Sequence, residues 1–299
     1  MRARARLEVE RGGVVRTLRS APPLTLIPVR GRPVVHLVNS AASPLGGDDL
    51  TLTVRVGAHA CLTLSGVAAA VALPGPRGLP SRMAVHLELS EGARVEYLPE
   101  PTVITRRARH ESVLVVSLAG DAHLHTRETV VLGRDGELPG ELTTTTHVTR
   151  DGHPVLRQTL VVTREVLLGN RVLATELSTS DDRDTASGTW WSRTRLAAGG
   201  TLTTSLADDA VTASRQLAAA ALLGTRQQVP RHQRRGVRVG AEVGEVQDAP
   251  AHEPVRGVAV VHADPGAGEH RVDPARVAAG HEPAHPARPG RGEHADDHL

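Results

Sequence analysis

Apolar and polar residues alternate along most of the first 165 residues of this chain. Residues 50–56 read Leu-Thr-Leu-Thr-Val-Arg-Val, and residues 84–89 read Ala-Val-His-Leu-Glu-Leu. A period of two places successive side chains on opposite faces of an extended chain, so each run predicts a strand with one buried face. Runs rich in β-branched residues at 113–118, 128–132 and 159–163 favour strands as well. We predict roughly ten or more short strands and a mainly-β fold.

A glycine recurs at the turns between these runs. Gly57, Gly92 and Gly120 each separate two alternating segments, at intervals of roughly 30 residues. Glycine supplies the positive φ that tight turns require. This weak repetition predicts stacked or solenoid-like antiparallel and mixed β-sheets, with ordinary unrelated hairpins as the alternative.

The core must be built almost entirely from valine, leucine and alanine. The 299 residues include no phenylalanine, one tyrosine and two tryptophans, and no lysine accompanies the arginines. The net charge of +2 gives no strong field for attracting a polyanion, and the aromatic side chains on which nucleic-acid bases stack are scarce. We therefore expect no nucleic-acid partner.

The cysteine count and the N-terminal segment bear on location. Cys61 is the single cysteine, which excludes an intramolecular disulfide and a metal site made of cysteines alone. We expect it in the core of a strand. The N-terminus is basic but lacks the apolar stretch of a signal peptide, and no run of 18 apolar residues occurs. These features predict a cytoplasmic protein that does not enter a membrane.

The composition changes near the end of the alternating region. Residues 207–223 combine early acids with an alanine- and leucine-rich body, and Gly224 follows, which predicts a C-terminal helix. Residues 226–297 contain no leucine, serine or threonine, so they offer too little apolar surface to offset the entropy of ordering. We predict a β domain with one or two C-terminal helices over residues 1–225 and a low-complexity, disordered tail over 226–299.

Histidines suggest two metal-binding hypotheses. Half of the 16 histidines lie in the tail without a fixed spacing. This fits either a nickel-binding tail or the residue composition that a shifted reading frame in GC-rich DNA would produce. Resequencing the locus would decide between these. His123 and His125 are two residues apart, so a strand would direct both to one face beside Arg127. They are candidate metal ligands, with a solvated strand face as the alternative.

Catalytic signatures are missing from the sequence. We find no Gly-x-Ser-x-Gly elbow, no His-Glu-x-x-His motif and no phosphate-binding Gly-x-x-x-x-Gly-Lys loop. We therefore expect that the protein is not an enzyme.

Four motifs carry a resemblance to a known family. Residues 39–56 place a small-residue loop and Gly-Gly-Asp before a strand, and residues 92–103 read Gly-Ala-Arg-Val-Glu-Tyr-Leu-Pro-Glu-Pro-Thr-Val. Glu-Thr-Val-Val-Leu-Gly-Arg follows at 128–134, and then come Gly140 with Glu141 and an Arg-Asp-Gly turn at 150–152. In this order they resemble the UreD/UreH family of urease accessory proteins, with a weaker likeness to about residue 225.

The resemblance implies a scaffold of stacked sheets that helps nickel enter apo-urease. Its implied partners are the urease apoprotein, the accessory protein UreF and the GTPase UreG. It also implies an internal, water-filled path along which nickel passes in transit, with no tightly bound cofactor. Carboxylates suit such a path because they hold a cation more loosely than thiolates do.

Motif matching carries a few residues over as ion-path or partner candidates. Gly46, Gly47 and Asp48 form the Gly-Gly-Asp motif, although Asp48 could instead cap its own turn. Glu128 is the acid before Leu-Gly-Arg, although it could be a solvated strand residue. Further candidates are Glu100 and Glu141.

This chain departs from the family pattern in three places. Gln158 stands where some members have an acid, residues 65–74 are nearly all apolar where the family has a polar segment, and the tail replaces a folded C-terminal segment. Two other functions therefore stay open: a mainly-β ligand-binding or metal-binding module unrelated to urease, and a β-rich metalloenzyme that uses His123 and His125.

Overall fold

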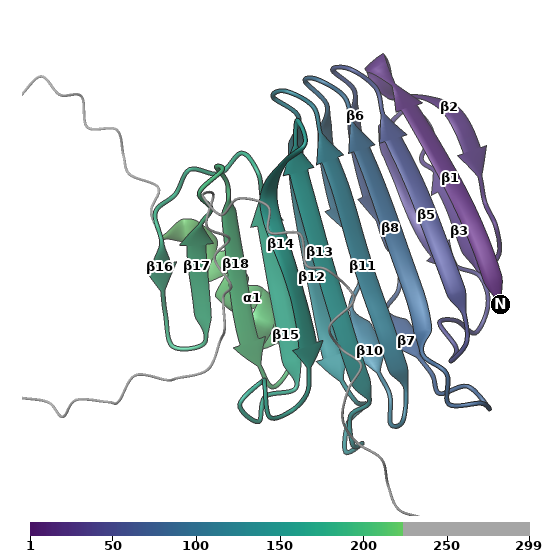
Figure 1. The fold of residues 1–299 in the computed structure, drawn as a ribbon, viewed down its shortest axis with the longest axis vertical. Coiled ribbons are helices and arrows are strands. Elements are labelled where there is room, and N and C mark those ends of the chain that lie inside the picture. Colours follow the sequence, from purple (N-terminus) through teal and green to yellow (C-terminus); the bar gives the residue numbers. More distant parts are fainter. Residues whose placement is uncertain (224–299) are drawn as a thin grey trace, which may run out of the picture. The chain divides into compact units, whose positions relative to one another are not determined.

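The computed structural model describes residues 1–223, which fold into two stacked β-sheets and one α-helix (Figure 1). The seven-stranded sheet, here sheet A, has the order β14-β13-β11-β8-β5-β1-β2. Its strands are β1 (Arg2–Glu10), β2 (Val14–Arg19), β5 (Asp49–Val56), β8 (Ser81–Leu89), β11 (Arg109–Leu118), β13 (Glu141–Arg150) and β14 (His153–Val162).

The eleven-stranded sheet, here sheet B, has the order β16-β17-β18-β15-β12-β9-β6-β4-β3, and β10 pairs with both β12 and β7. A short 3-10 helix, η1 (Arg11–Gly13), links β1 to β2. The strands of sheet B are β3 (Leu24–Pro28), β4 (Val34–Asn39), β6 (Cys61–Ser65), β7 (Ala70–Ala72), β9 (Arg94–Leu98), β10 (Thr102–Ile104), β12 (His123–Leu132), β15 (Val172–Ser178), β16 (Ala186–Ser187), β17 (Trp191–Arg195) and β18 (Thr201–Ala207).

The middle of the chain winds between the sheets as a solenoid. In sheet A, β5, β8, β11 and β13 are parallel neighbours, while β6, β9 and β12 are parallel neighbours in sheet B. The turns at Gly57, Gly92 and Gly120 stack on one another: the Ser90 N–H donates to Val56 O, and the Ala119 N–H donates to Leu89 O, both at 2.9 Å. The predicted solenoid-like arrangement is confirmed. These turns join strands of different sheets, so they are not hairpins.

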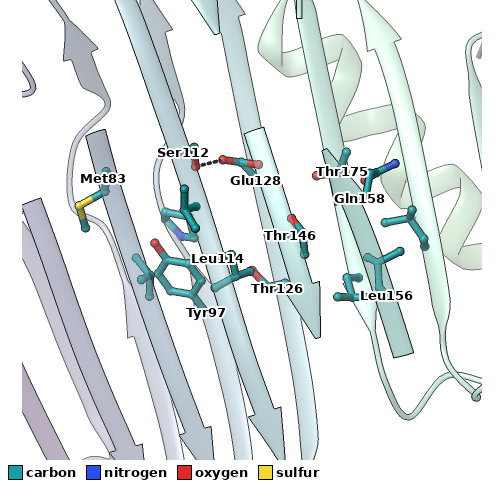
Figure 2. Close-up of a pocket in the computed structure, with 15 residues that line it drawn as sticks. Met83, Tyr97, Ser112, Leu114, Thr126, Glu128, Thr146, Leu156, Gln158 and Thr175 are labelled. Carbon is teal, nitrogen blue, oxygen red and sulfur yellow. Dashed lines mark hydrogen bonds between the residues drawn. The ribbon is translucent and has the colours of Figure 1, made fainter. Parts of the chain in front are cut away.

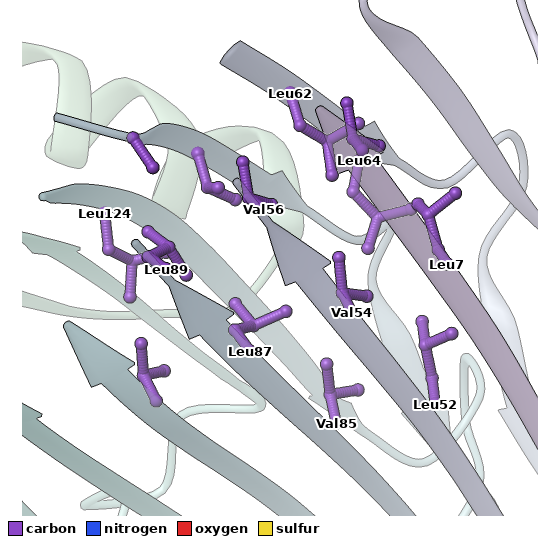
Figure 3. Close-up of a cluster of buried hydrophobic side chains, with 14 of the residues drawn as sticks. Leu7, Leu52, Val54, Val56, Leu62, Leu64, Val85, Leu87, Leu89 and Leu124 are labelled. Carbon is purple, nitrogen blue, oxygen red and sulfur yellow. The ribbon is translucent and has the colours of Figure 1, made fainter. Parts of the chain in front are cut away.

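The core lies between the sheets and consists of small aliphatic side chains. Figure 3 shows Leu52, Val54 and Val56 of β5 on the same side as Leu87 and other leucines and valines of both sheets. All belong to one buried cluster, which follows directly from the period-two pattern. The expected core position of Cys61 is wrong: it is exposed at the start of β6, because Leu62 and Leu64 occupy the buried face.

The C-terminal helix α1 (Ala210–Leu222) confirms the predicted helix. Asp209 caps it, since its carboxylate accepts a hydrogen bond from the Thr212 N–H at 2.9 Å. Leu217 and the alanines of its buried face pack on β15 and β18 of sheet B. Gly224 and the predicted tail, 226–299, lie outside the described residues. Within residues 1–223 no helix has the length and apolar character to span a membrane.

Candidate functional site

A cavity of about 60 Å³ lies between the two sheets near their middle (Figure 2). Strands β8, β11, β13 and β14 of sheet A and β9, β12, β15 and β18 of sheet B contribute to it. Its lining residues are Met83, Val85, Tyr97, Pro99, Ser112, Val113, Leu114, Thr126, Glu128, Thr146, Leu156, Gln158, Thr175, Leu177 and Leu202.

Glu128 connects the two sheets across this cavity. It lies on β12 of sheet B, and its carboxylate accepts hydrogen bonds from Ser112 Oγ at 2.7 Å and from Thr144 Oγ1 at 3.0 Å. Ser112 and Thr144 belong to β11 and β13 of sheet A. Hydrogen bonds to a charged oxygen are stronger than neutral ones, so both hydroxyls fix the position of the carboxylate. Among the lining residues, Glu128 is the one carboxylate.

Tyr97 brings a phenol to the same cavity. Burial, followed by the charge of Glu128, raises the pKa of the Tyr97 hydroxyl above its ordinary value. Both causes disfavour the phenolate, because a buried anion beside another anion is costly. The hydroxyl therefore stays protonated over the whole physiological range.

The cavity is polar enough and large enough to hold water. Its volume accommodates about two to four water molecules, and hydroxyl, amide and carboxylate oxygens are present to bind them. Such hard oxygen donors coordinate divalent cations without the tight grip of thiolate ligands. Gln158 lies here too, so the position that departs from the family pattern belongs to the same cavity as Glu128.

Asp48 serves a different purpose from Glu128. It is buried, and its carboxylate accepts hydrogen bonds from the Met1 ammonium at 2.7 Å, from Ser43 Oγ at 2.7 Å and from the Leu45 N–H at 2.9 Å. Burial alone would raise the pKa of the Asp48 carboxyl, but these hydrogen bonds outweigh burial and hold that pKa below its ordinary value. Asp48 thus closes its own turn, and an ion-path or partner role for it stays a prediction.

Gly46 and Gly47 shape that turn. A Cβ on Gly46 would lie 2.3 Å from the Gly75 nitrogen, so two backbone segments meet there at a distance that only glycine permits. Gly47 has a φ of +94°, in the region that L side chains rarely adopt. The Gly-Gly-Asp motif is therefore a backbone junction between the loop before β5 and the loop before β8.

The other predicted residues lie on the surface or on the outer face of sheet B. Glu100 and Glu141 are exposed, and Glu141 forms an ion pair with Arg109 at 3.3 Å. His125 Nε2 lies 3.7 Å from the Glu176 carboxylate, while the buried His123 Nδ1 has no hydrogen-bond partner among residues 1–223. None of these four residues lines the cavity.

Within residues 1–223, no three histidines, cysteines or acids are grouped so that they could hold a metal ion together. The cavity also contains residues that sequence reasoning missed, notably Ser112, Thr126 and Thr146. Their signal was weak but present: each is a polar residue at a position whose alternation directs it toward the buried face. A serine or threonine in a strand is common, so this pattern alone does not single out a site.

The fold and the cavity define a mainly-β solenoid protein with one carboxylate in the lining of its inter-sheet cavity. Residues 1–240 match the family described as UreD urease accessory protein. Urease accessory protein UreD 1 of Saccharopolyspora erythraea is 51% identical over 240 residues, which cover 74% of this chain and 94% of that protein. Urease accessory protein UreD of Frankia alni is 37% identical over 216 residues, covering 62% and 72%. The chain belongs to the UreD family of urease accessory proteins.

Proposed function

We propose that this protein is a non-catalytic metallochaperone scaffold that helps insert nickel into apo-urease in the cytoplasm. It acts in a complex with the urease apoprotein, UreF and the GTPase UreG. Nickel is the cargo, and the protein retains none of it tightly.

The observation that carries this proposal is the inter-sheet cavity with Glu128 as its one lining carboxylate. A carboxylate held by Ser112 and Thr144 offers a cation a charged oxygen in a fixed position. A single carboxylate with neutral oxygens nearby binds a divalent ion weakly enough to release it. Delivery through a protein also protects the urease site from copper, which most nitrogen and oxygen sites prefer over nickel.

The test is complementation of cells that make urease but lack their own UreD protein. We expect the full chain to restore nickel-dependent urease activity. Glu128→Gln keeps the shape of the side chain and removes its charge, so it should lower the nickel content of urease at limiting nickel by about tenfold, the factor that roughly 1.4 kcal/mol of lost ion binding gives. Co-purification with the urease apoprotein should stay unchanged, since Glu128 is internal.

Glu141→Gln is the matched control. It removes the same charge from an exposed residue that pairs with Arg109 at the surface, so it should activate urease as the unchanged chain does. Equal activation by Glu128→Gln and the unchanged chain would show that nickel does not use the cavity. A folded full chain that fails to restore any activity would refute the proposed function itself.

A further inference from the structure

The two sheets end at different places. Strand β14 is the last strand of sheet A. Its Leu156 lines the inter-sheet cavity together with Leu202 of β18, and its Leu160 packs against the same buried cluster as Leu206 of β18. Sheet B continues with β17 and β16. Figure 1 shows these two strands projecting past β14 with no strand of sheet A beside them. The protein therefore has a step, formed by the free edge of β14 above the uncovered end of sheet B.

Among residues 1–223, no strand pairs with the outer edge of β14. The N–H groups of Glu141 and Asp151, at the two ends of β13, are directed toward β11 and away from β14. They donate to Ala108 O and Leu118 O at 2.8 and 2.9 Å. The even-numbered residues of β13 therefore bond to β14. By the register of that pair, the backbone groups directed away from β13 belong to Arg157, Thr159 and Val161.

The uncovered end of sheet B offers a surface beneath that edge. Ser205 and Ala207 of β18 face α1, so alternate residues face the other way. We call the polar part of this second set, together with its neighbours on β17, the shelf; it consists of Ser192, Thr194 and Thr204. Leu202 and Leu206, which also pack against the buried clusters, border it on the side of β14. Trp190, which is 43% exposed, borders it just before β17. The shelf is uncharged, and its hydroxyl side chains beside the two border leucines suit contact with threonine and aliphatic side chains of another strand.

The charge of the step is one-sided. Strands β14, β17 and β18 contain no aspartate or glutamate, whereas Arg157 is exposed on the edge strand beside His147 of β13. An incoming strand with a carboxylate next to Arg157 would meet no opposing acid on these three strands. A sheet edge of this length is a template for pairing with another chain, and Pro154 and Arg157 are the residues on it that restrict such pairing to a complementary partner.

A second copy of this chain does not fit the step by antiparallel pairing. Two β14 strands related by a twofold axis would need that axis perpendicular to the sheet, which puts both B sheets on the same side. The projecting β17 and β16 of each copy would then occupy the space of the other copy's sheet B. The room above the shelf, one or two strand spacings of about 4.8 Å, suits a single extended segment.

We propose that the step accepts an extended segment of a partner polypeptide, which extends sheet A by one strand. Its residues facing the shelf are valine, leucine or threonine, and its outward residues include a carboxylate beside Arg157. Backbone hydrogen bonds to Arg157, Thr159 and Val161 supply the affinity, and the shelf supplies the selectivity. This inference stands apart from the proposed nickel route, since it concerns the outside of the fold.

The test uses the full chain and the peptide acetyl-Val-Glu-Val-Thr-Val-Glu-Val-amide. In the free chain, the amides of Arg157, Thr159 and Val161 should exchange rapidly with deuterium, and the peptide should slow them about tenfold or more. Thr159→Pro removes the central outward N–H without touching the β13 ladder and should weaken binding about tenfold. Thr159→Val is its matched control: both variants lose the hydrogen bond to Thr145, but valine keeps the N–H, so its binding should be unchanged.

A second variant covers the case in which proline prevents folding. Ser192→Arg adds a long side chain to an exposed shelf position and should block the peptide while the melting temperature stays unchanged. Slow exchange of the three amides in the free chain would overturn the proposal, because another part of the chain would already fill the edge. The proposal would also be overturned if the unchanged chain formed a dimer that Thr159→Pro abolished. Peptide binding that is the same in the unchanged chain, Thr159→Pro and Ser192→Arg would overturn it as well.

Discussion

Replacing Asp48 with asparagine should destabilise the fold while sparing the function. Asp48 Oδ2 accepts from Ser43 and Leu45, and Oδ1 accepts from the Met1 ammonium. An asparagine oxygen at the Oδ2 position keeps the first two bonds in a weaker, neutral form, while its NH2 group faces the ammonium and loses the third. A hydrogen bond to a buried charge contributes about 1.5–3 kcal/mol, and the bond to Met1 counts for about 1 kcal/mol because that ammonium is 45% exposed. The expected loss is about 3 kcal/mol, which lowers the melting temperature of a domain of this size by roughly 6–12 °C.

The pH dependence provides a sharper readout than the melting temperature alone. Because the folded-state pKa of Asp48 lies below its ordinary value, the carboxylate stabilises the fold fully at pH values above about 4. This stabilisation is lost as the pH falls through the folded-state pKa. The stability gap between the unchanged chain and Asp48→Asn should therefore be constant from about pH 7 to pH 5 and shrink below about pH 4.

The assay is urea unfolding of the full chain and of Asp48→Asn across this pH range, with urease activation measured in parallel at 20 °C. Asp48→Asn should activate urease normally there, because it does not line the cavity. A gap that widens as the pH falls would refute the hydrogen-bond reasoning. Lost activation by a folded Asp48→Asn chain would restore the ion-path interpretation of this residue.

Two further stability predictions concern other buried positions. Gly46→Ala should destabilise the fold by about 3 kcal/mol or more, because its Cβ would lie 2.3 Å from the Gly75 backbone. Gly57→Ala serves as the comparison in thermal melts, because the nearest atom to its Cβ, Val9 O, would lie at an ordinary contact distance of 3.4 Å. Burial lowers the pKa of the His110 imidazole to about 4, so the unfolded chain takes up a proton that the folded chain refuses between about pH 6.5 and pH 4. This group should cost about 3 kcal/mol of stability over that range, and urea unfolding of His110→Gln should show a correspondingly flatter pH profile.

The strands and their stacking could be predicted because both depend on patterns of residues that are close together in the sequence. The alternation at 50–56 and 84–89 predicts the same buried side chains that the structure shows. The spacing of Gly57, Gly92 and Gly120 corresponds to one turn of the solenoid. Cys61 shows how the same rule is misapplied. Leu62 and Leu64 already indicated which face was buried, and an adjacent residue had to lie on the other face.

The site was harder to predict because it depends on contacts between distant strands. Glu128 meets Ser112 and Thr144 across two sheets, and no local pattern specifies which strands will face each other. Motif likeness gave Asp48 and Glu128 equal standing, although one closes a turn and the other enters a cavity. Shared sequence identifies a residue that matters, whereas only packing shows whether it acts on structure or on a ligand.

The position of the tryptophans has an optical consequence. Trp190 and Trp191 are the two tryptophans of the entire chain, and both lie beside the step, at the end of sheet B that sheet A leaves uncovered. Indole fluorescence therefore reports on this end of the molecule, while the coils around Glu128 contribute a single tyrosine, Tyr97. A strand added at the step would change the fluorescence emission of Trp190, so binding at the edge of β14 can be followed without an added label.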